Sequence, residues 1–161
     1  MLVRFPILAL IGLLTATPAL SQQIAFGGIK GDTKAPVEVT ADELAVNQTT
    51  GLAVFSGNVL IGQGAMRLQA ARVEVEYGAG DQSKIDRLHA TGGVTLVSEN
   101  EAAEAAEAVY DVAKGTVALI GDVLLTQGEN VMSGQRLDVD LATGTGQMQG
   151  RVHTILQPGG N

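Results

Sequence analysis

The residues of this chain that could carry chemistry are few and scattered. His89 and His153 are the only histidines, and neither has another histidine or a cysteine at metal-ligand spacing. No serine stands in a G-x-S-x-G sequence, so a nucleophile elbow is not indicated. Gly62-Gln63-Gly64 joins two expected strands, whereas a phosphate loop needs amides at the start of a helix. We therefore expect no metal, no cofactor and no enzyme activity.

Composition narrows the function further. The 161 residues carry a formal net charge of −7, with no cysteine, no tryptophan and 3% aromatic residues. An acidic chain is unsuited to nucleic acid, which requires clustered cations. Thiolate metal sites are excluded, and aromatic platforms for stacking sugars or bases are not expected. The carboxylates of Asp122, Asp138 and Asp140 lack a neighbouring cation in sequence and are interpreted as solvated charges on an outer face.

The elements that would position a site form a repeat. Thr50–Gly64 reads TGLAVFSGNVLIGQG, and Lys114–Gly128 reads KGTVALIGDVLLTQG. Two partial copies lie at 90–96 and 144–152. The glycines of the four copies are spaced 35, 29 and 29 residues apart, at Gly57, Gly92, Gly121 and Gly150. Such a period indicates stacked supersecondary units, so function is expected on a surface that many strands build together.

Apolar and polar residues alternate between turns that recur every 8–12 residues, which is typical of an all-β protein. The alternation changes phase at Asp42-Glu43, which suggests a bulge. Glu101–Ala108 (EAAEAAEA) is ambiguous, because its local propensity favours a helix. The repeat instead favours a strand, and eight residues are short for an isolated helix. We favour the strand and keep a helical turn as the alternative.

One set of apolar residues, the predicted groove residues, is expected to share an inner face. The set is Val39, Leu44, Phe55, Val59, Ile61, Leu68, Val73, Val75, Val94, Leu96, Leu119, Val123, Leu125, Met132, Leu137 and Val139. These residues would form a core in any β protein. A long stack of short hairpins that does not close end to end would also enclose an elongated apolar trough, in which acyl chains could lie out of water.

The two ends of the chain have different compositions from the repeat. Residues 1–21 combine Arg4, an apolar stretch and small residues before Gln22, the pattern of a cleaved signal peptide; an uncleaved anchor is the alternative. Residues 22–36 are glycine-rich and are expected to be a flexible leader. The domain is expected at 37–156, followed by a flexible tail at 157–161.

The first copy resembles the OstA-like family. Gly57-Asn58-Val59, Gln63-Gly64 and Ala71, with Ala41-Asp42 upstream, match the pattern of this family. The second copy matches less strictly, with Asp122 for Asn and Gly134 for Ala. The resemblance extends over about Pro36 to Val152.

The resemblance implies an open, twisted β-jelly roll of short antiparallel strands in the periplasm. It also implies a bridge that carries lipopolysaccharide from the inner to the outer membrane, with the acyl chains in the groove. Its partners would be further copies joined head to tail, and OstA-like proteins of the inner and outer membranes. The alternative that the residues leave open is a structural β-repeat scaffold with a closed core and no ligand.

Overall fold

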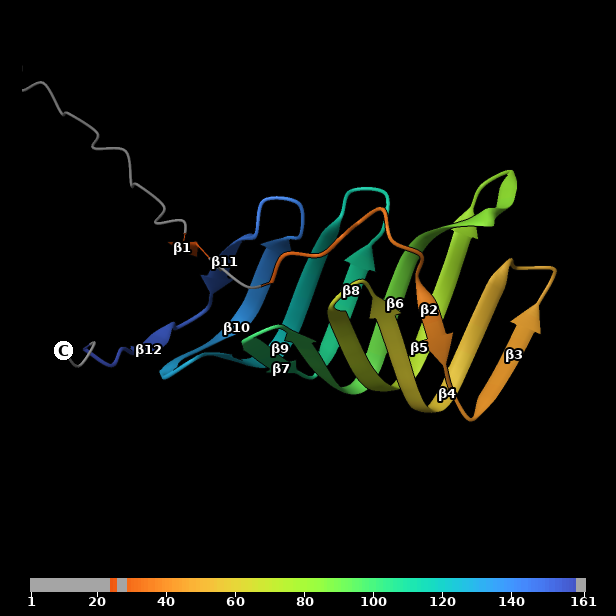
Figure 1. Ribbon diagram of the computed structural model, residues 1–161. Coiled ribbons are helices and arrows are strands. Elements are labelled where there is room, and N and C mark those ends of the chain that lie inside the picture. Colours follow the sequence, from red (N-terminus) through yellow and green to blue (C-terminus); the bar gives the residue numbers. More distant parts are fainter. Residues whose placement is uncertain (1–23, 26–28, 159–161) are drawn as a thin grey trace, which may run out of the picture.

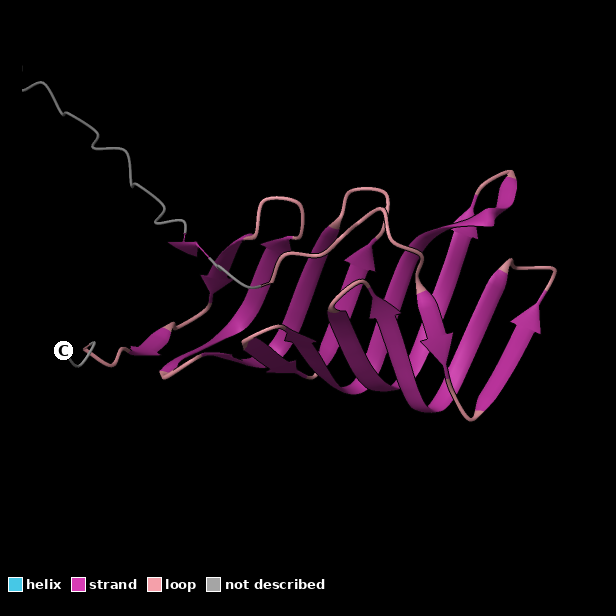
Figure 2. Cartoon of the chain, viewed as in Figure 1, coloured by secondary structure: helices cyan, strands magenta, loops and turns pink. Residues whose placement is uncertain are grey.

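The computed structural model of this protein describes residues 24–25 and 29–158, so the expected signal peptide lies outside the described residues. The described residues form twelve strands and no helix (Figure 2), which confirms the all-β prediction. The strands are β1 (Ile24–Ala25), β2 (Glu38–Thr40), β3 (Glu43–Asn47), β4 (Leu52–Gln63), β5 (Met66–Gly78), β6 (Asp81–Ser98), β7 (Glu101–Ala105), β8 (Glu107–Asp111), β9 (Thr116–Gln127), β10 (Asn130–Asp140), β11 (Thr145–Gln149) and β12 (His153–Ile155).

The strands form two layers that are joined along a line of bends (Figure 1). All strand pairs are antiparallel, and the long strands β4, β5, β6, β9 and β10 each contribute one half to each layer. Sheet A contains β2, β7 and β12 with the adjoining halves of the long strands. Sheet B contains β3, β8, β11 and β1 with the other halves. The predicted open β-jelly roll is therefore confirmed.

The bends coincide with the four glycines of the repeat. Their φ angles are 77°, 84°, 84° and 81° at Gly57, Gly92, Gly121 and Gly150. The residue after each glycine also has a positive φ, namely Asn58, Gly93, Asp122 and Arg151. Where both strands continue through the bend, these two residues lie opposite a single residue of the neighbouring strand. A bulge of this kind bends the strand and increases its twist, so the repeat fixes where the sheet folds over.

The first residue of each bend must be glycine-sized, because the neighbouring strand lies close to it. A Cβ at Gly92 would lie 2.6 Å from the Cβ of Ala71, and one at Gly121 would lie 3.0 Å from that of Ala106. The same position in the second copy is taken by Gln135, which faces Gly150. The expectation that Gly134 replaces Ala71 is wrong, because the register of β9 and β10 shifts between Gly134 and Arg136.

The ambiguous segment Glu101–Ala108 is strand, as the repeat predicts. It forms β7 and the start of β8, with Ala106 at the bend between them. Both strands pair with β6 on one side and with β9 on the other. Backbone pairing on both sides outweighs the helix propensity of so short a segment.

A side chain at a bend has two energetic costs, backbone strain at a positive φ and collision with the neighbouring strand. Substitutions at Gly92 and Gly93 can separate these two costs. Both have a positive φ, of 84° and 87°, but a Cβ at Gly93 would meet nothing within 4 Å. Gly93→Ala should therefore destabilise the fold by about 1 kcal/mol through backbone strain alone. Gly92→Ala should cost more, roughly 2–4 kcal/mol, because it also collides with Ala71. Equal shifts in the urea midpoint would contradict the steric contribution.

Candidate functional site

The inner face of sheet A carries an unbroken row of side chains that crosses all eight of its strands, from β2 to β12. Directly opposed residues on antiparallel neighbours point to the same face, so the strand register defines the row. It consists of Val39, Ile61, Leu68, Leu96, Ala103, Leu125, Met132 and Thr154. A second row beside the bends contains Val59, Ala70 and Val94, with Val123 at the equivalent position of β9.

Sheet B faces these residues with two rows of its own. The row near the bends is Leu44, Phe55, Val73, Ala90, Ala108, Leu119, Leu137 and Met148. The row of the inner face that lies farther from the bends is Val46, Ala53, Val75, Leu88, Tyr110, Val117 and Val139. The structure thus places every predicted groove residue on the inner face, and their contact with a ligand remains a prediction.

The inner face is closed in the middle and open at both ends. Most of its residues, among them Val73, Leu119 and Leu137, are no more than 3% exposed. At the β3 end, in contrast, Leu44 and Val46 are 53% and 62% exposed although they belong to the inner rows. At the other end, next to β12, Val152 and Leu156 are 45% and 68% exposed. Among the described residues, the inner face is thus exposed at the β3 end, and apolar side chains next to β12 are exposed at the other end.

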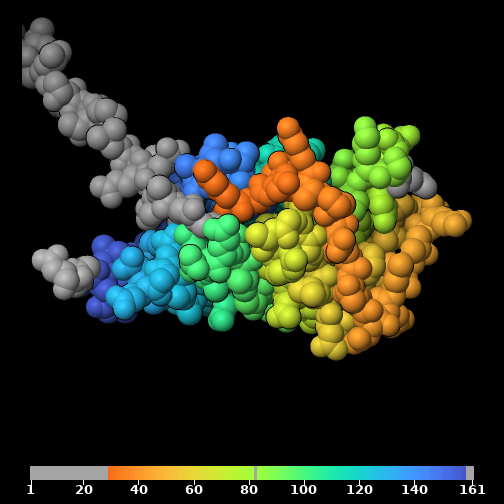
Figure 3. All heavy atoms as spheres, in the orientation of Figure 1, coloured from red at the N-terminus to blue at the C-terminus, as the bar shows by residue number. Residues whose placement is uncertain are grey.

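A strap, residues 29–37, covers the long side of the jelly roll that lies opposite the bends. It follows β1, which pairs with β11 of sheet B, and leads into β2, which pairs with β4 in sheet A. It therefore runs along the molecule and crosses from one sheet to the other (Figure 1). In the surface view the strap (orange) lies between the turns of sheet B and the strands of sheet A (Figure 3).

Buried polar side chains lie beneath the strap. Tyr110 of sheet B donates a hydrogen bond to Oε1 of Gln63 of sheet A at 2.6 Å, and Nε2 of Gln63 donates to the carbonyl of Ala35 in the strap at 2.9 Å. Tyr110 and Gln63 are each 2% exposed, and burial raises the pKa of the Tyr110 phenol above its ordinary value. This chain of hydrogen bonds ties both sheets and the strap together.

Glu101 of sheet A also holds the strap, at the strap's N-terminal end. Its carboxylate accepts a hydrogen bond from Nε2 of Gln127 at 2.7 Å and from the amide of Ile29 at 3.1 Å. Sequence reasoning missed Tyr110, Gln63 and Glu101 as members of the site. The alternation that located Leu119 also places Tyr110 on the inner face, but no apolar signal marks Gln63 or Glu101.

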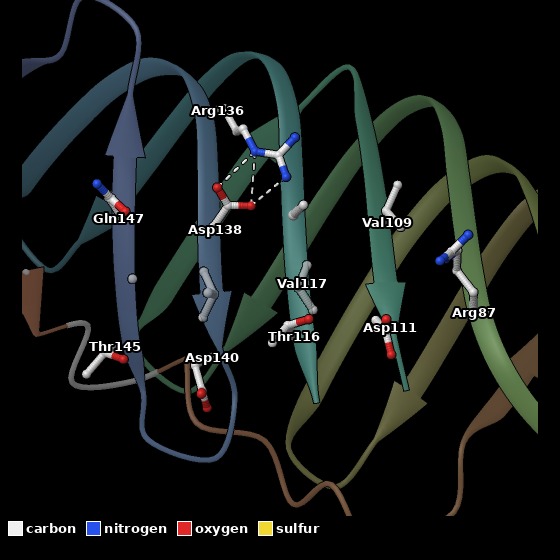
Figure 4. A pocket seen from close by; sticks show the side chains of 13 residues that line it. Arg87, Val109, Asp111, Thr116, Val117, Arg136, Asp138, Asp140, Thr145 and Gln147 are labelled. Atoms are coloured by element: carbon white, nitrogen blue, oxygen red, sulfur yellow. Dashed lines mark hydrogen bonds and ion pairs between the residues drawn. The ribbon is translucent and has the colours of Figure 1, made fainter. Parts of the chain in front are cut away.

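The outer face of sheet B has a shallow hollow of about 480 Å³ with a different character (Figure 4). Charged side chains, among them Arg87 and Arg136, line it together with apolar residues such as Val109 and Ala118. Arg136 donates to Asp138 at 2.7 Å, and this hydrogen bond raises the pKa of the guanidinium.

His89 lies elsewhere on the outer face, 3.1 Å from Glu107. Within residues 24–25 and 29–158, no group of histidine and carboxylate side chains is arranged to hold a metal.

Comparison with known proteins identifies the family. Residues 38–145 match a family described as "LptA/(LptD N-terminal domain) LPS transport protein". The chain belongs to this family. An uncharacterised protein of Rhizobium meliloti (strain 1021) is 32% identical over 157 residues, which cover 90% of this chain and 84% of that protein. The lipopolysaccharide export system protein LptA of Escherichia coli K12 is 26% identical over 132 residues, which cover 79% and 71%.

A solved structure supports the fold assignment. LptH of Pseudomonas aeruginosa, described as the LptA homologous periplasmic component of a lipopolysaccharide transport device, superposes with a TM-score of 0.70. The match is 19% identical and covers 80% of this chain and 99% of that one. The described part of the chain contains no helix long and apolar enough to span a membrane.

The phenol of Tyr110 should make stability depend on alkaline pH. Because burial raises its pKa in the folded state, this group stabilises the fold fully below its unfolded pKa of about 10. The contribution is lost as the pH rises through the folded pKa. Tyr110→Phe should lower the free energy of unfolding at pH 8 by about 1–3 kcal/mol, because Oε1 of Gln63 loses its donor. It should also flatten the decline above pH 10 in urea titrations.

Tyr77, the other tyrosine of the chain, provides the matched control. Tyr77→Phe leaves the hydrogen bond between Tyr110 and Gln63 in place, so the part of the alkaline decline that comes from Tyr110 should persist in this variant. The role of Tyr110 would be refuted if the two variants had identical pH profiles.

Proposed function

We propose that this protein binds lipopolysaccharide through its acyl chains between the two sheets and carries it across the periplasm from the inner to the outer membrane. One observation carries the proposal: the inner row of sheet A is apolar on every strand from β2 to β10, and apolar side chains are exposed at both ends of the molecule. Family membership supports it, because LptA of E. coli is named as an export protein for this lipid.

The dimensions and chemistry of the inner face suit acyl chains. The seven strands from β2 to β10 lie at about 4.8 Å spacing and give an apolar path of roughly 29 Å. Each methylene removed from water contributes about 0.8 kcal/mol, so a few chains supply ample affinity without any polar recognition. The outer face of sheet B carries arginines and carboxylates such as Arg72, Glu74 and Asp138, and is suited to water.

The two open ends suit assembly in a row. Among the described residues, β2 and β3 each pair only with β4 at one end, and β12 pairs only with β10 at the other end. Free strand edges are templates for another chain. An end that docks on the opposite end of a second copy is a heterologous contact, which builds an open filament and not a closed dimer. The same edges would receive the related proteins of the two membranes and would make one continuous inner surface.

The closed middle of the inner face favours a second candidate, a structural scaffold that binds no lipid. The protein's own side chains fill this part of the space between the sheets. A lipid carrier must therefore separate its sheets to load, whereas a scaffold need not. Labelling by lipid distinguishes the two functions.

A photoreactive residue on the inner face should become crosslinked to lipopolysaccharide in cells. We expect labelling at Val59 and Val123, which are each 1% exposed on the inner rows. Outward positions Glu74 and Asp138 serve as matched controls and should remain unlabelled. Equal labelling at the two sets, or labelling at neither, would refute the lipid carrier, and the second result would favour the scaffold.

The two ends can be tested separately. Val46→Asp and Leu156→Asp each place a charge at an exposed apolar position at one end of the molecule, so each should abolish the assemblies that form at high protein concentration. A mixture of the two variants retains one intact end of each kind and should form heterodimers that grow no further in light scattering. Val97→Asp, on the outer face of sheet A, is the control and should assemble normally. Unimpaired assembly of the single variants would contradict the head-to-tail contact.

A further inference from the structure

The strap closes the long side of the jelly roll by touching both sheets at almost the same place. Asp32 packs against the turn at Gly64, where an added Cβ would lie 3.3 Å from the Cβ of Asp32. The next residue, Thr33, packs against the turn at Gly115, where an added Cβ would lie 3.1 Å from Cγ2. Gly64 follows β4 in sheet A, and Gly115 precedes β9 in sheet B. The opening between the sheets is thus only one chain wide here.

The same bridging continues along the strap. Before this point, the amide of Ile29 donates to Glu101 of sheet A, and the amide of Gly31 donates to the carbonyl of Leu141 beside sheet B. After it, the carbonyl of Ala35 accepts from Gln63 of sheet A. The side chain of Ile29 is 1% exposed and packs in the core. The strap therefore fills the opening and also contributes to the interior.

An amphiphile in this groove meets a geometric constraint. Its acyl chains lie inside and its sugars outside, so the junction between them must cross the opening. Along residues 29–36 the strap already occupies that crossing, and lipid and strap cannot share it. We propose that the strap is a displaceable closure, which seals the empty groove and is released when the polar junction of a lipid takes its place. This inference rests on the proposed lipid-binding function.

The attachment of the strap suits reversible release. Residues 29–37 belong to no strand, and the preceding strand β1 has only two paired residues. Segments with few backbone pairings open at low free energy while the rest of a fold remains intact. The side-chain amide of Gln63, which donates to the strap carbonyl of Ala35, could then donate to an ester or amide carbonyl of the entering junction.

A disulfide between the strap and the turn at Gly115 tests the proposal. The Cβ of Thr33 lies 3.9 Å from the Cβ position at Gly115, which is within the range for a disulfide. The chain has no cysteine of its own, so Thr33→Cys with Gly115→Cys can form no other intramolecular bond. With a photoreactive residue at Val59 and purified lipopolysaccharide, the oxidised protein should lose labelling. Dithiothreitol should restore labelling to the level of the two single-cysteine variants.

A second disulfide controls for stiffening of the sheet. Gln69→Cys with Thr95→Cys joins directly opposed residues on the outer face of sheet A, away from the strap, and its oxidation should leave labelling unchanged. Hydrogen exchange of the wild type adds an independent readout. The amides of Ile29 and Gly31 should exchange slowly in the empty protein and faster with lipopolysaccharide bound.

The possible outcomes distinguish failure of the strap proposal from failure of the lipid-binding proposal on which it rests. Equal labelling of the oxidised and reduced Thr33→Cys/Gly115→Cys protein would overturn the closure and leave the lipid carrier intact. Unchanged exchange at Ile29 and Gly31 in lipid-loaded protein would also overturn it. Absence of labelling in every form, including the wild type, would refute the lipid carrier and the closure together.

Discussion

The bend at the repeated glycines is the constraint on which the rest of the molecule depends. At the bends of β4, β6 and β9, two successive residues with positive φ lie opposite one residue of the neighbouring strand, and these strands thereby pass from one sheet into the other. L-residues other than glycine resist this backbone, and a Cβ at the first position would also strike the facing strand. Because the bends align from strand to strand, two apolar faces are held against each other, and no helix of the described residues covers them.

The same inner face serves stability and, in our proposal, binding. In the structure the protein's own side chains fill its middle, as a stable fold requires. A carrier has to exchange these contacts for contacts with acyl chains of similar chemistry, and this exchange is nearly balanced because both are apolar. The difference between the empty and the lipid-loaded protein then lies mainly in the hydrogen bonds of the buried polar groups. The hydrogen bonds from Tyr110 to Gln63 and from Gln63 to Ala35 join parts that would separate on loading.

The ends of the jelly roll complete this arrangement. A β-sandwich that functions alone normally protects its outer strands, whereas here the inner-face residue Val46 and the apolar residue Leu156 next to β12 are exposed to solvent near strand edges. The strap covers the long side and leaves these ends uncovered. In our proposed function, closure along the side and exposure at the ends together direct a lipid along the stack from one copy to the next.

The sequence by itself determined the repeat, the all-β class and the inner face. Alternation within each strand and the spacing of the glycines are local properties, so they can be recognised in the order of the residues alone. Even the segment Glu101–Ala108 could be assigned as strand, because the repeat outweighed its helix propensity. The phase change at Asp42-Glu43 likewise coincides with the point where β2 ends and β3 begins.

Only the tertiary structure decided that residues 29–37, the strap, close the long side of the jelly roll. On β5 the inner residues change from even to odd numbers between Ala70 and Val73, because a single residue spans that bend. Gln135 faces Gly150 for the same reason. The segment 29–36 has the composition of a leader, yet Ile29 is buried in the core. The partners of Ile29, Gly31 and Ala35 are Glu101, Leu141 and Gln63, and contacts so distant in sequence arise only when both sheets are in place.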